Sequence, residues 1–315
     1  MPAGMGRRAV REPHGFVSAL CLYRSIMPKI PFLKMSGSGN DFIIIDNRKG
    51  IIAAANIATF VRNVCCRRMS VGGDGLILVE KSDAADFKWR FFNSDGSLAE
   101  MCGNGARCVA RFAYVNHIAG SDMSFETDAG IVSATVSDRR VKINMPDPDN
   151  LELNDVVELA TGPQAFSSVN TGVPHVVVPA EDIDSAQVVT IGREIRHHQK
   201  FRPAGTNVNF ISLRPDGVVA VRTYERGVED ETLACGTGAI ACAIVLAAQL
   251  KKPSPIDVET KSGGYLRIYF KEKNGHFFDI FLEGDARIIY KGKLWEDSWN
   301  YDQDPFDGPK RIVKP

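Results

Sequence analysis

The sequence predicts an α+β protein of two pseudo-symmetric lobes, in each of which a β-rich sheet or barrel wraps around a central helix. A short motif occurs twice, and its leading cysteines, Cys102 and Cys235, are 133 positions apart. Glu126-Thr127 recurs at the same offset as Glu259-Thr260. Two matches at one offset indicate a duplicated half-chain in which each half carries one cysteine at an equivalent place.

Strand signals dominate the chain. Segments rich in Val, Ile and Phe and bounded by Gly, Asp, Asn or Pro predict strands at residues 41–46, 75–80, 87–93, 131–136, 141–145, 167–170, 175–179, 207–213, 218–224, 265–271, 277–283 and 286–291. Apolar periodicity predicts helices at residues 52–66, 105–117, 191–197 and 238–250. Two of these helices follow the repeated cysteine motif directly, so we expect them to be the central helices of the two lobes.

The predicted domain organisation follows the duplication. Residues 28–146 form the N-terminal lobe, with 284–300 crossing back to it, and residues 147–283 form the C-terminal lobe. The Pro- and Asp-rich segment 145–153 is the expected linker. Residues 1–27, rich in Arg, are either a targeting segment or an extension from an upstream start codon, and we favour the second. We expect residues 301–315 to be a frayed tail.

Composition excludes several function classes. Lys+Arg and Asp+Glu each count 38 in 315 residues, so net charge gives no reason to expect nucleic acid or an anionic membrane as a partner. Apolar runs are far shorter than a bilayer span. The seven cysteines are odd in number and form no C-x-x-C pair, which argues against a disulfide framework or a zinc site. We therefore expect a cytoplasmic protein with reduced thiols and no metal.

The repeated cysteines suit proton transfer. Two facing acid/base groups are needed when a proton leaves one face of a carbon and returns to the other, which indicates a racemase or epimerase. Cys102 and Cys235 each precede a helix, whose N-terminus lowers a thiol pKa. Glycines beside them leave backbone N–H groups free to hold a carboxylate and the charge that develops on it. One sulfur would be thiolate and the other thiol, with coupled titration.

Other candidate residues have simpler explanations. Buried packing accounts for the remaining cysteines of the folded part, Cys65, Cys66, Cys108 and Cys242. The Gly-rich segments 36–40 and 71–75 complete neither a phosphate-binding loop nor a dinucleotide fingerprint. Packing explains His175 about as well as catalysis does.

The assembled motifs closely resemble the diaminopimelate epimerase family. They run in the family's order through nearly the whole chain, as Lys-Met-Ser-Gly-Ser-Gly-Asn-Asp-Phe (34–42), Phe-Asn-Ser-Asp-Gly-Ser (92–97), Met-Cys-Gly-Asn-Gly-Ala-Arg-Cys (101–108), Thr-Asn-Val-Asn-Phe (206–210), Tyr-Glu-Arg-Gly (224–227) and Glu-Thr-Leu-Ala-Cys-Gly-Thr-Gly (231–238). The resemblance implies two lobes that close over a small-molecule substrate, interconversion of LL- and meso-diaminopimelate without a cofactor, and a homodimer.

The resemblance also implies roles for individual residues. Cys102 and Cys235 are the expected acid/base pair. The α-carboxylate and α-amine end of the substrate would be bound by Gly103, Asn104, Gly236 and Thr237. The rest of the substrate would be recognised by Asn40, Asn93, Asn207, Glu225 and Arg226. Elementary chemistry agrees for the last two, because a guanidinium can grip a distal carboxylate and a carboxylate can accept from an ammonium.

The chain departs from the family pattern at three places. Val173 replaces an amide before Pro-His, Gly75 stands where some members carry Gln, and the early Met-His-Gly-Leu-Gly-Asn pattern reads Met-Ser-Gly-Ser-Gly-Asn here. The first two departures concern selectivity for the distal end. A racemase or epimerase of another amino acid is thus an alternative. A thiol redox or ligand-binding protein is a third, although a redox pair would be closer in sequence.

Overall fold

The first half of the chain forms one curved sheet. The structure, a computed structural model, describes residues 29–52, 56–99 and 101–301. The expected N-terminal extension and nearly all of the expected tail lie outside these residues. The strands of this half are β1 (Ile30–Gly37), β2 (Asn40–Asp46), β3 (Gly75–Glu80), β4 (Phe87–Asn93), β5 (Leu98–Ala99), β6 (Asp122–Thr127), β7 (Gly130–Ser137) and β8 (Arg140–Asn144).

The second half repeats this arrangement. Its strands are β9 (Asp149–Leu159), β10 (Gly162–Asn170), β11 (Pro174–Pro179), β12 (Asn207–Leu213), β13 (Val219–Glu225), β14 (Asp230–Thr232), β15 (Ile256–Thr260), β16 (Tyr265–Lys273) and β17 (His276–Asp285). The order β1-β2-β3-β4-β6-β7-β8 has the same sequence of antiparallel and parallel pairings as β10-β11-β12-β13-β15-β16-β17. The duplication inferred from two short matches therefore extends to the whole topology.

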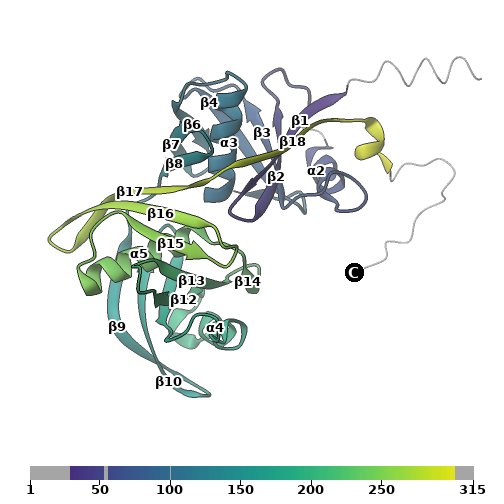
Figure 1. The fold of residues 1–315 in the computed structure, drawn as a ribbon. Helices are drawn as coiled ribbons and strands as arrows, with labels where there is room; N and C mark the ends of the chain where they lie inside the picture. The colour runs from purple at the N-terminus through teal and green to yellow at the C-terminus, as the bar shows by residue number, and fades with distance from the viewer. Residues whose placement is uncertain (1–28, 53–55, 100, 302–315) are drawn as a thin grey trace, which may run out of the picture.

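Two strands join the halves. β17 pairs with β16 of the second half and with β8 of the first. β18 (Arg287–Leu294) continues from β17 and pairs with β1. In Figure 1 these strands run, pale green to yellow, from the lower left half to the upper right half. Any residue of β17 at the crossing is therefore placed to contact elements of both halves.

A central helix fills the concave side of each half-sheet. These helices are α3 (Gly103–Val115) and α5 (Gly236–Leu250), and α5 is buried from Gly238 to Ala247. Both contribute to one apolar cluster that extends through the two halves. The apolar face of a helix must be covered, and here the sheet and the other central helix cover it.

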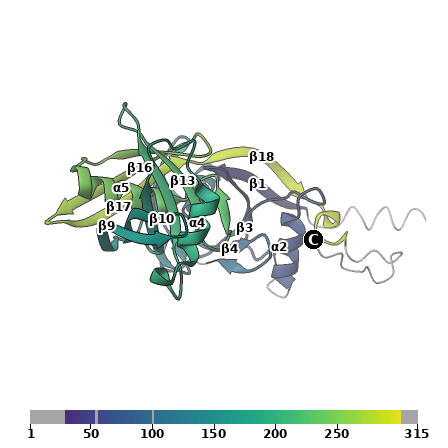
Figure 2. The same ribbon diagram turned by 90° about the horizontal axis from the view of Figure 1, so that it is seen from below.

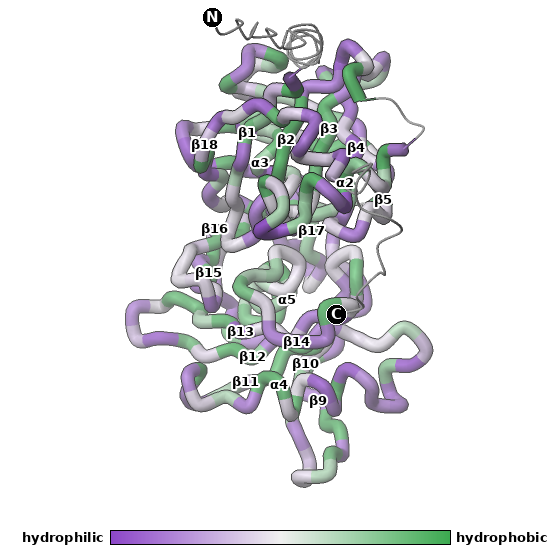
Figure 3. The backbone as a smooth tube through the Cα atoms, turned by 90° about the vertical axis from the view of Figure 1, so that its right-hand side faces the viewer, coloured by the Kyte–Doolittle hydropathy of each residue, from purple (hydrophilic) through white to green (hydrophobic). Residues whose placement is uncertain are grey.

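A second helix covers the outer face of each half-sheet. α2 (Ile57–Cys65) packs on β3 and β4, and α4 (Val188–His197) packs on β12 and β13. Figure 2 shows α2 at the end of the first half that faces away from α4 and α5. Figure 3 shows hydrophobic stretches along β1, β2 and β3 in the first half. Each half is thus a sheet between two helices.

The predicted fold class is confirmed, and most predicted elements are present. The central helices begin two residues earlier than expected, directly after the cysteines. The linker prediction for residues 145–153 is wrong over its second part, because β9 begins at Asp149. Asp, Asn and Glu have low strand propensity, but β9 forms by pairing with β10 across a tight turn. The lobe boundaries at residues 146 and 284 stay a prediction.

Candidate active site

Both repeated cysteines cap the central helices. Cys102 is the N-cap residue of α3, and Cys235 is the N-cap residue of α5. Each has extended backbone torsions, φ −149° and −120° respectively. Their carbonyls accept the first helical bonds, from the N–H of Ala106 at 2.8 Å and of Ala239 at 3.0 Å. The side chain of an N-cap residue lies beside the unpaired N–H groups of the first turn. Both sulfurs therefore lie at positive helix ends.

A cavity of about 560 Å³ contains both cysteines. Its volume suits a small organic ligand. Ten of the residues predicted from the sequence line it, namely Asn40, Cys102, Gly103, Asn104, Asn207, Glu225, Arg226, Cys235, Gly236 and Thr237. These residues come from both halves of the chain. The structure thus brings together side chains that are almost two hundred positions apart in the sequence.

Asn93 is the predicted site residue that does not line this cavity. It ends β4, is exposed, and its amide nitrogen donates to Ser97 Oγ at 3.0 Å. In the sheet it is opposite Gly75. Its role in substrate recognition stays a prediction.

The first residues of both helices pack against one side chain of the crossing strand. A Cβ at Gly103 would lie 3.3 Å from Leu282 Cδ2, and one at Gly236 would lie 3.0 Å from the same atom. Leu282 is fully buried on β17. A larger residue at either place would press on the leucine, so glycine allows this close approach. Leu282 consequently fixes where the two helix ends lie relative to each other.

Burial sets the ionisation of the cysteines. It raises the pKa of Cys235 to about 12, and the charge of Glu225 acts in the same direction. The Thr237 hydroxyl and the Gly238 N–H oppose this effect. The two groups lie 3.4 Å from Cys235 Sγ. Both cysteines still keep partial exposure toward the cavity.

Cys102 is affected in the same direction. Burial raises the pKa of its thiol, against the opposing effects of the Gly105 and Asn104 N–H groups and the Arg107 guanidinium. The expectation that helix ends would lower both thiol pKa values is therefore wrong, because the net shift is upward at both cysteines. The helix ends act as expected, but desolvation of the charged form outweighs them.

The polar end of the cavity carries opposite charges. Glu225 ends β13 and Arg226 follows it, and burial raises the pKa of the Glu225 carboxyl. The Arg226 N–H donates to Asn207 Oδ1 at 2.9 Å, and Asn207 Nδ2 donates to the carbonyl of Pro174 at 3.2 Å. Asn207 thereby holds the Glu-Arg pair at the edge of the cavity. A carboxylate and a guanidinium side by side suit a ligand with both an ammonium and a carboxylate.

Several cavity residues were not predicted to belong to the site. Met101 and Ala234 line it, and they precede the two cysteines at the same offset of 133 positions. That equivalence could have identified them. Thr171, in the turn before β11, also lines the cavity, and its hydroxyl donates to the carbonyl of Thr237 at 3.1 Å. Val173 is in the same wall.

The remaining cysteines and His175 lie elsewhere. Cys65, Cys108 and Cys242 are buried in the core, as expected, whereas Cys66 is half-buried. His175 is a buried residue of β11 with Nδ1 3.1 Å from Asn209 Nδ2, and burial lowers its pKa to about 3. It is therefore neutral near pH 7. In the described ranges, no group of His, Cys, Asp or Glu side chains is placed to hold a metal ion.

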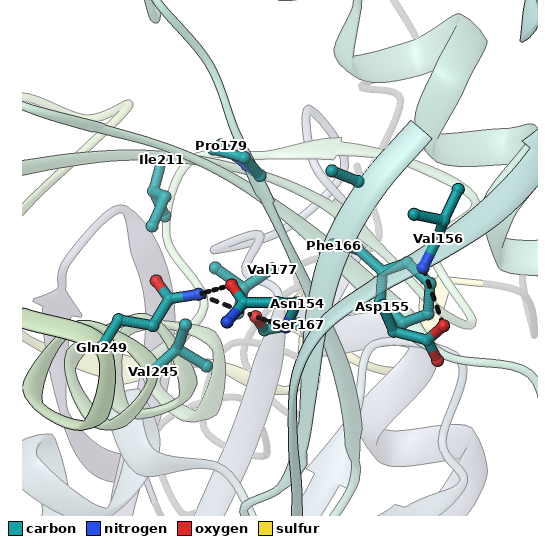
Figure 4. A pocket seen from close by; sticks show the side chains of 11 residues that line it. Asn154, Asp155, Val156, Phe166, Ser167, Val177, Pro179, Ile211, Val245 and Gln249 are labelled. Atoms are coloured by element: carbon teal, nitrogen blue, oxygen red, sulfur yellow. Dashed lines mark hydrogen bonds between the residues drawn. The ribbon is translucent and has the colours of Figure 1, made fainter. Parts of the chain in front are cut away.

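A smaller cavity of about 140 Å³ lies behind the end of α5. Figure 4 shows Gln249 Nε2 donating to Asn154 Oδ1 at 2.9 Å and to Ser167 Oγ at 3.1 Å. Its other walls are largely apolar, as at Val177 and Val245. The polar groups there bind one another, which is typical of packing between a helix and a strand pair.

Of the helices in the described part of the chain, none could span a membrane.

Solved structures with the same fold include a phenazine biosynthesis protein and a hydroxyproline epimerase. The chain matches a phenazine biosynthesis protein of the PhzF family from Bacillus anthracis with a TM-score of 0.67 at 16% identity, over 85% of this chain and 99% of that one. It matches a hydroxyproline epimerase from Agrobacterium vitis with a TM-score of 0.63 at 16% identity, over 85% and 93% of the two chains. At these identities the likeness concerns the fold.

Sequence relatives are closer. The chain is 46% identical to the diaminopimelate epimerase of Aquifex aeolicus (strain VF5) over 282 residues, which cover 86% of this chain and 99% of that protein. It is 40% identical to the diaminopimelate epimerase of Archaeoglobus fulgidus over 287 residues, or 87% and 99% of the two chains. The sequence model of diaminopimelate epimerase matches residues 32–150 and 167–289. The resemblance seen in the motifs is confirmed, and the chain belongs to the diaminopimelate epimerase family of isomerases.

Proposed function

We propose that the chain interconverts LL- and meso-diaminopimelate without a cofactor, with Cys102 and Cys235 as a thiolate/thiol pair. The observation that carries the proposal is that both cysteines cap pseudo-equivalent helices and line one cavity. An acid/base group on each side of a carbon is what inversion by proton transfer requires.

The proton transfer can be written with these two sulfurs. A thiolate at one cysteine takes the α-hydrogen, so the C–H bond breaks and an S–H bond forms. The thiol at the other cysteine gives its hydrogen to the opposite face, so its S–H bond breaks and a new C–H bond forms. The pair ends with its protonation exchanged, ready for the opposite stereoisomer. Turnover in the other direction restores the starting state.

The helix ends supply the stabilisation of charge. Gly103, Asn104, Gly236 and Thr237 occupy the first turns of α3 and α5, where N–H groups have no helical partner. The α-carboxylate would accept from these groups, and the negative charge that develops in the transition state spreads onto that carboxylate. Donors fixed by two helices need no rearrangement as the charge appears.

Ionisation of a buried thiol is supported by the substrate itself. Burial raises the pKa of both cysteines. An α-ammonium bound in the cavity brings a positive charge beside them, and a nearby opposite charge favours the thiolate. The half-buried Glu225 carboxylate and the Arg226 guanidinium would bind the distal ammonium and carboxylate, which fixes the reacting carbon between the sulfurs.

A second substrate class is supported by Val173. This apolar side chain lines the cavity where the family pattern led us to expect an amide. An epimerase of another amino acid therefore remains the alternative. Glu225 and Arg226 favour a substrate with two charged ends. Turnover of a panel of amino acids decides between the two, because a monocarboxylic substrate would leave Arg226 without its partner.

The two-cysteine step is tested by replacing one sulfur at a time. Cys102→Ser and Cys235→Ser should each lower kcat by about a thousandfold or more, because a serine hydroxyl is a far weaker base near pH 7. Cys66→Ser is the matched control, since Cys66 is half-buried and does not line the cavity. Turnover near the unmodified rate in either site variant would rule out the two-base mechanism.

We further infer a cytoplasmic homodimer. The cysteines of the described residues are free thiols, which supports a reducing compartment. Exposed apolar side chains gather on β18 and just beyond it, at Ile288, Ile289, Tyr290 and Trp295, and such groups are typical of contact surfaces. The proposed lobes, 28–146 with 284–300 and 147–283, would each contribute one cysteine. Light scattering of the purified chain tests the dimer, and a monomer mass at micromolar concentration would contradict it.

A further inference from the structure

Arg107 is a fully buried cation in the second turn of α3. It forms no ion pair within the part of the chain that the structure describes, although a buried charge is costly without partners. Its guanidinium donates instead to Ser38 Oγ at 2.7 Å, to Asn104 Oδ1 at 2.7 Å and to the carbonyl of Gly103 at 3.2 Å. The crossing strand leaves room for it, because a Cβ at Gly284 would lie 2.9 Å from Arg107 Nε.

The duplication shows that the fold does not require this arginine. The position 133 residues later in the second half is Ile240, which is buried in α5. An apolar residue thus serves at the equivalent place of an equivalent helix. The hydrogen bonds of Arg107 are thus a feature of the first half and not of the repeated fold.

A directed series of hydrogen bonds leads from Arg107 to the surface. Asn104 Oδ1 accepts from the guanidinium, and Asn104 Nδ2 donates to Asn40 Oδ1 at 2.7 Å. Asn40 Nδ2 in turn donates to Asp74 Oδ2 at 2.9 Å. A guanidinium can only donate and a carboxylate can only accept. The two amides between them are consequently fixed in orientation from both ends.

The acceptor end of the series is held by charged neighbours. Arg67 Nη2 donates to Asp74 Oδ1 at 2.9 Å, and the Asp41 N–H donates to Asp74 Oδ2 at 3.1 Å. Arg67 and Lys34 also pair with Asp41, whose pKa is about 2 despite its burial. Asp74 therefore lies in a network of charges that keeps it in place as an acceptor.

The amides that this series orients are in the cavity wall. Asn40 and Asn104 both line the cavity beside Cys102. An amide nitrogen carries two hydrogens, so one bond to a neighbour leaves the other for a ligand. With both oxygens directed toward donors inside the protein, the wall presents N–H groups. Such a wall suits a carboxylate.

We propose that Arg107 is a positioning residue that, through Asn104 and Asn40 and with Asp74 at the opposite end, keeps both amide nitrogens directed toward a carboxylate of the substrate. The proposal deepens the proposed function and rests on it. Arg107 acts without touching the substrate, so its effect should be on substrate binding and should depend on Asn104.

The orientation of the amides can be measured without substrate. In ¹⁵N-labelled protein the side-chain amide signals of Asn40 and Asn104 can be assigned from Asn→Ala variants. Arg107→Met should shift the signals of both residues, including Asn40, which Arg107 does not touch. Arg111→Met is the matched control, because Arg111 lies one turn further along α3 and donates to the carbonyl of Ala286. Unchanged Asn40 and Asn104 signals in Arg107→Met would overturn the proposal.

A second variant keeps the proposal testable if Arg107→Met does not fold. Asp74→Asn alters the half-exposed end of the series and introduces a donor where Asn40 also donates. It should shift the Asn104 signals, although Asp74 and Asn104 are joined only through Asn40. An effect confined to Asn40 would show that the amides are not coupled and would overturn the proposal.

Kinetics test the consequence for the substrate. Arg107→Met should raise KM about tenfold or more, the cost of misaligned charge-assisted hydrogen bonds, with a smaller change in kcat. In an Asn104→Ala background the same substitution should add little to KM, because residues that act through one another are non-additive. Arg111→Met should leave KM unchanged. Full additivity would overturn the proposal. If the unmodified chain fails to turn over LL-diaminopimelate, the proposed function fails, while the amide signals still decide the role of Arg107.

Discussion

A Cβ placed on Gly238 would lie 2.3 Å from Asn209 Oδ1, so the first turn of α5 rests directly on a buried amide. Asn209 cannot move aside easily, because its nitrogen donates to the carbonyl of Val176 at 3.0 Å and its oxygen accepts from Thr223 Oγ1 at 3.0 Å. The Gly238 N–H donates to Cys235 Sγ. The position of this sulfur therefore depends on a contact that tolerates no side chain.

Gly238→Ala tests this dependence. The added methyl must displace either α5 or Asn209, and misplacing a reacting group by about 1 Å can cost about a hundredfold in rate. We expect kcat to fall by about that factor, with a lower Tm. Gly120→Ala is the control, since its added Cβ would meet nothing closer than 3.6 Å. Unchanged kcat in Gly238→Ala would show that α5 adjusts without moving Cys235.

Leu282 gives a second test of how the helix ends are placed. Leu282→Ala removes the side chain that contacts both Gly103 and Gly236, and truncation of a buried leucine costs about 2–5 kcal/mol of unfolding free energy. We expect this loss together with a large fall in kcat. Ile280→Ala, on the same strand and also buried, should lose stability without a comparable fall in kcat. Equal kinetic effects of the two variants would argue against a spacing role.

The two cysteines should differ in reactivity. Burial and then the Glu225 charge raise the pKa of Cys235 to about 12. Burial also raises the pKa of Cys102, but there Glu225 is the last of the causes, and the Gly105 and Asn104 N–H groups and the Arg107 guanidinium oppose the rise. The thiolate is the reactive form. Iodoacetamide near pH 8 should therefore label Cys102 before Cys235, as followed by peptide mass spectrometry. The half-buried Cys66 serves as an internal reference for reagent activity. Faster labelling of Cys235 would contradict the assigned electrostatics.

The Asp41 carboxyl group makes the free energy of unfolding depend on pH in the acid range. Burial raises its pKa, but Arg67 and Lys34 outweigh this and hold the pKa at about 2, below the ordinary value of 3.8. A carboxyl group whose pKa is lowered in the folded state stabilises the fold at pH values above its ordinary pKa. That stabilisation is lost as the pH falls through about 4 toward 2. Denaturant unfolding of Asp41→Asn should show a weaker loss in this window. Asp83→Asn, at an exposed position, should behave like the unmodified chain.

Much of the fold and site could be predicted from the sequence because the duplication is visible in it. The motifs at Cys102 and Cys235 predict the two central helices to within two residues of where they begin. The approach of Leu282 to the glycines after them is visible only in the structure. What could not be predicted depends on tertiary contacts. β9 has a polar sequence and forms only because β10 pairs with it. The cysteine pKa values follow from desolvation by residues distant in sequence.

Arg107 illustrates the same limit. In the sequence Arg107 and Arg111 both interrupt a largely apolar helix, and the motif at 101–108 does not say what Arg107 contacts. Its partner Ser38 lies 69 positions away, and the series beyond Asn104 passes through Asn40 to Asp74. Only the folded chain places these groups in line. Ile240 occupies the equivalent position of the second half, so only the first half carries this arginine.

The most direct test of the central claim is incubation of the purified, reduced chain with LL-diaminopimelate in D₂O without added cofactor, followed by chiral separation and mass analysis. The account predicts meso product that carries one deuterium at the inverted α-carbon, because the thiol that returns the hydrogen exchanges with solvent. The Cys102→Ser and Cys235→Ser proteins should form this product more slowly by about a thousandfold or more. Neither product nor exchange with the unmodified chain would contradict the account.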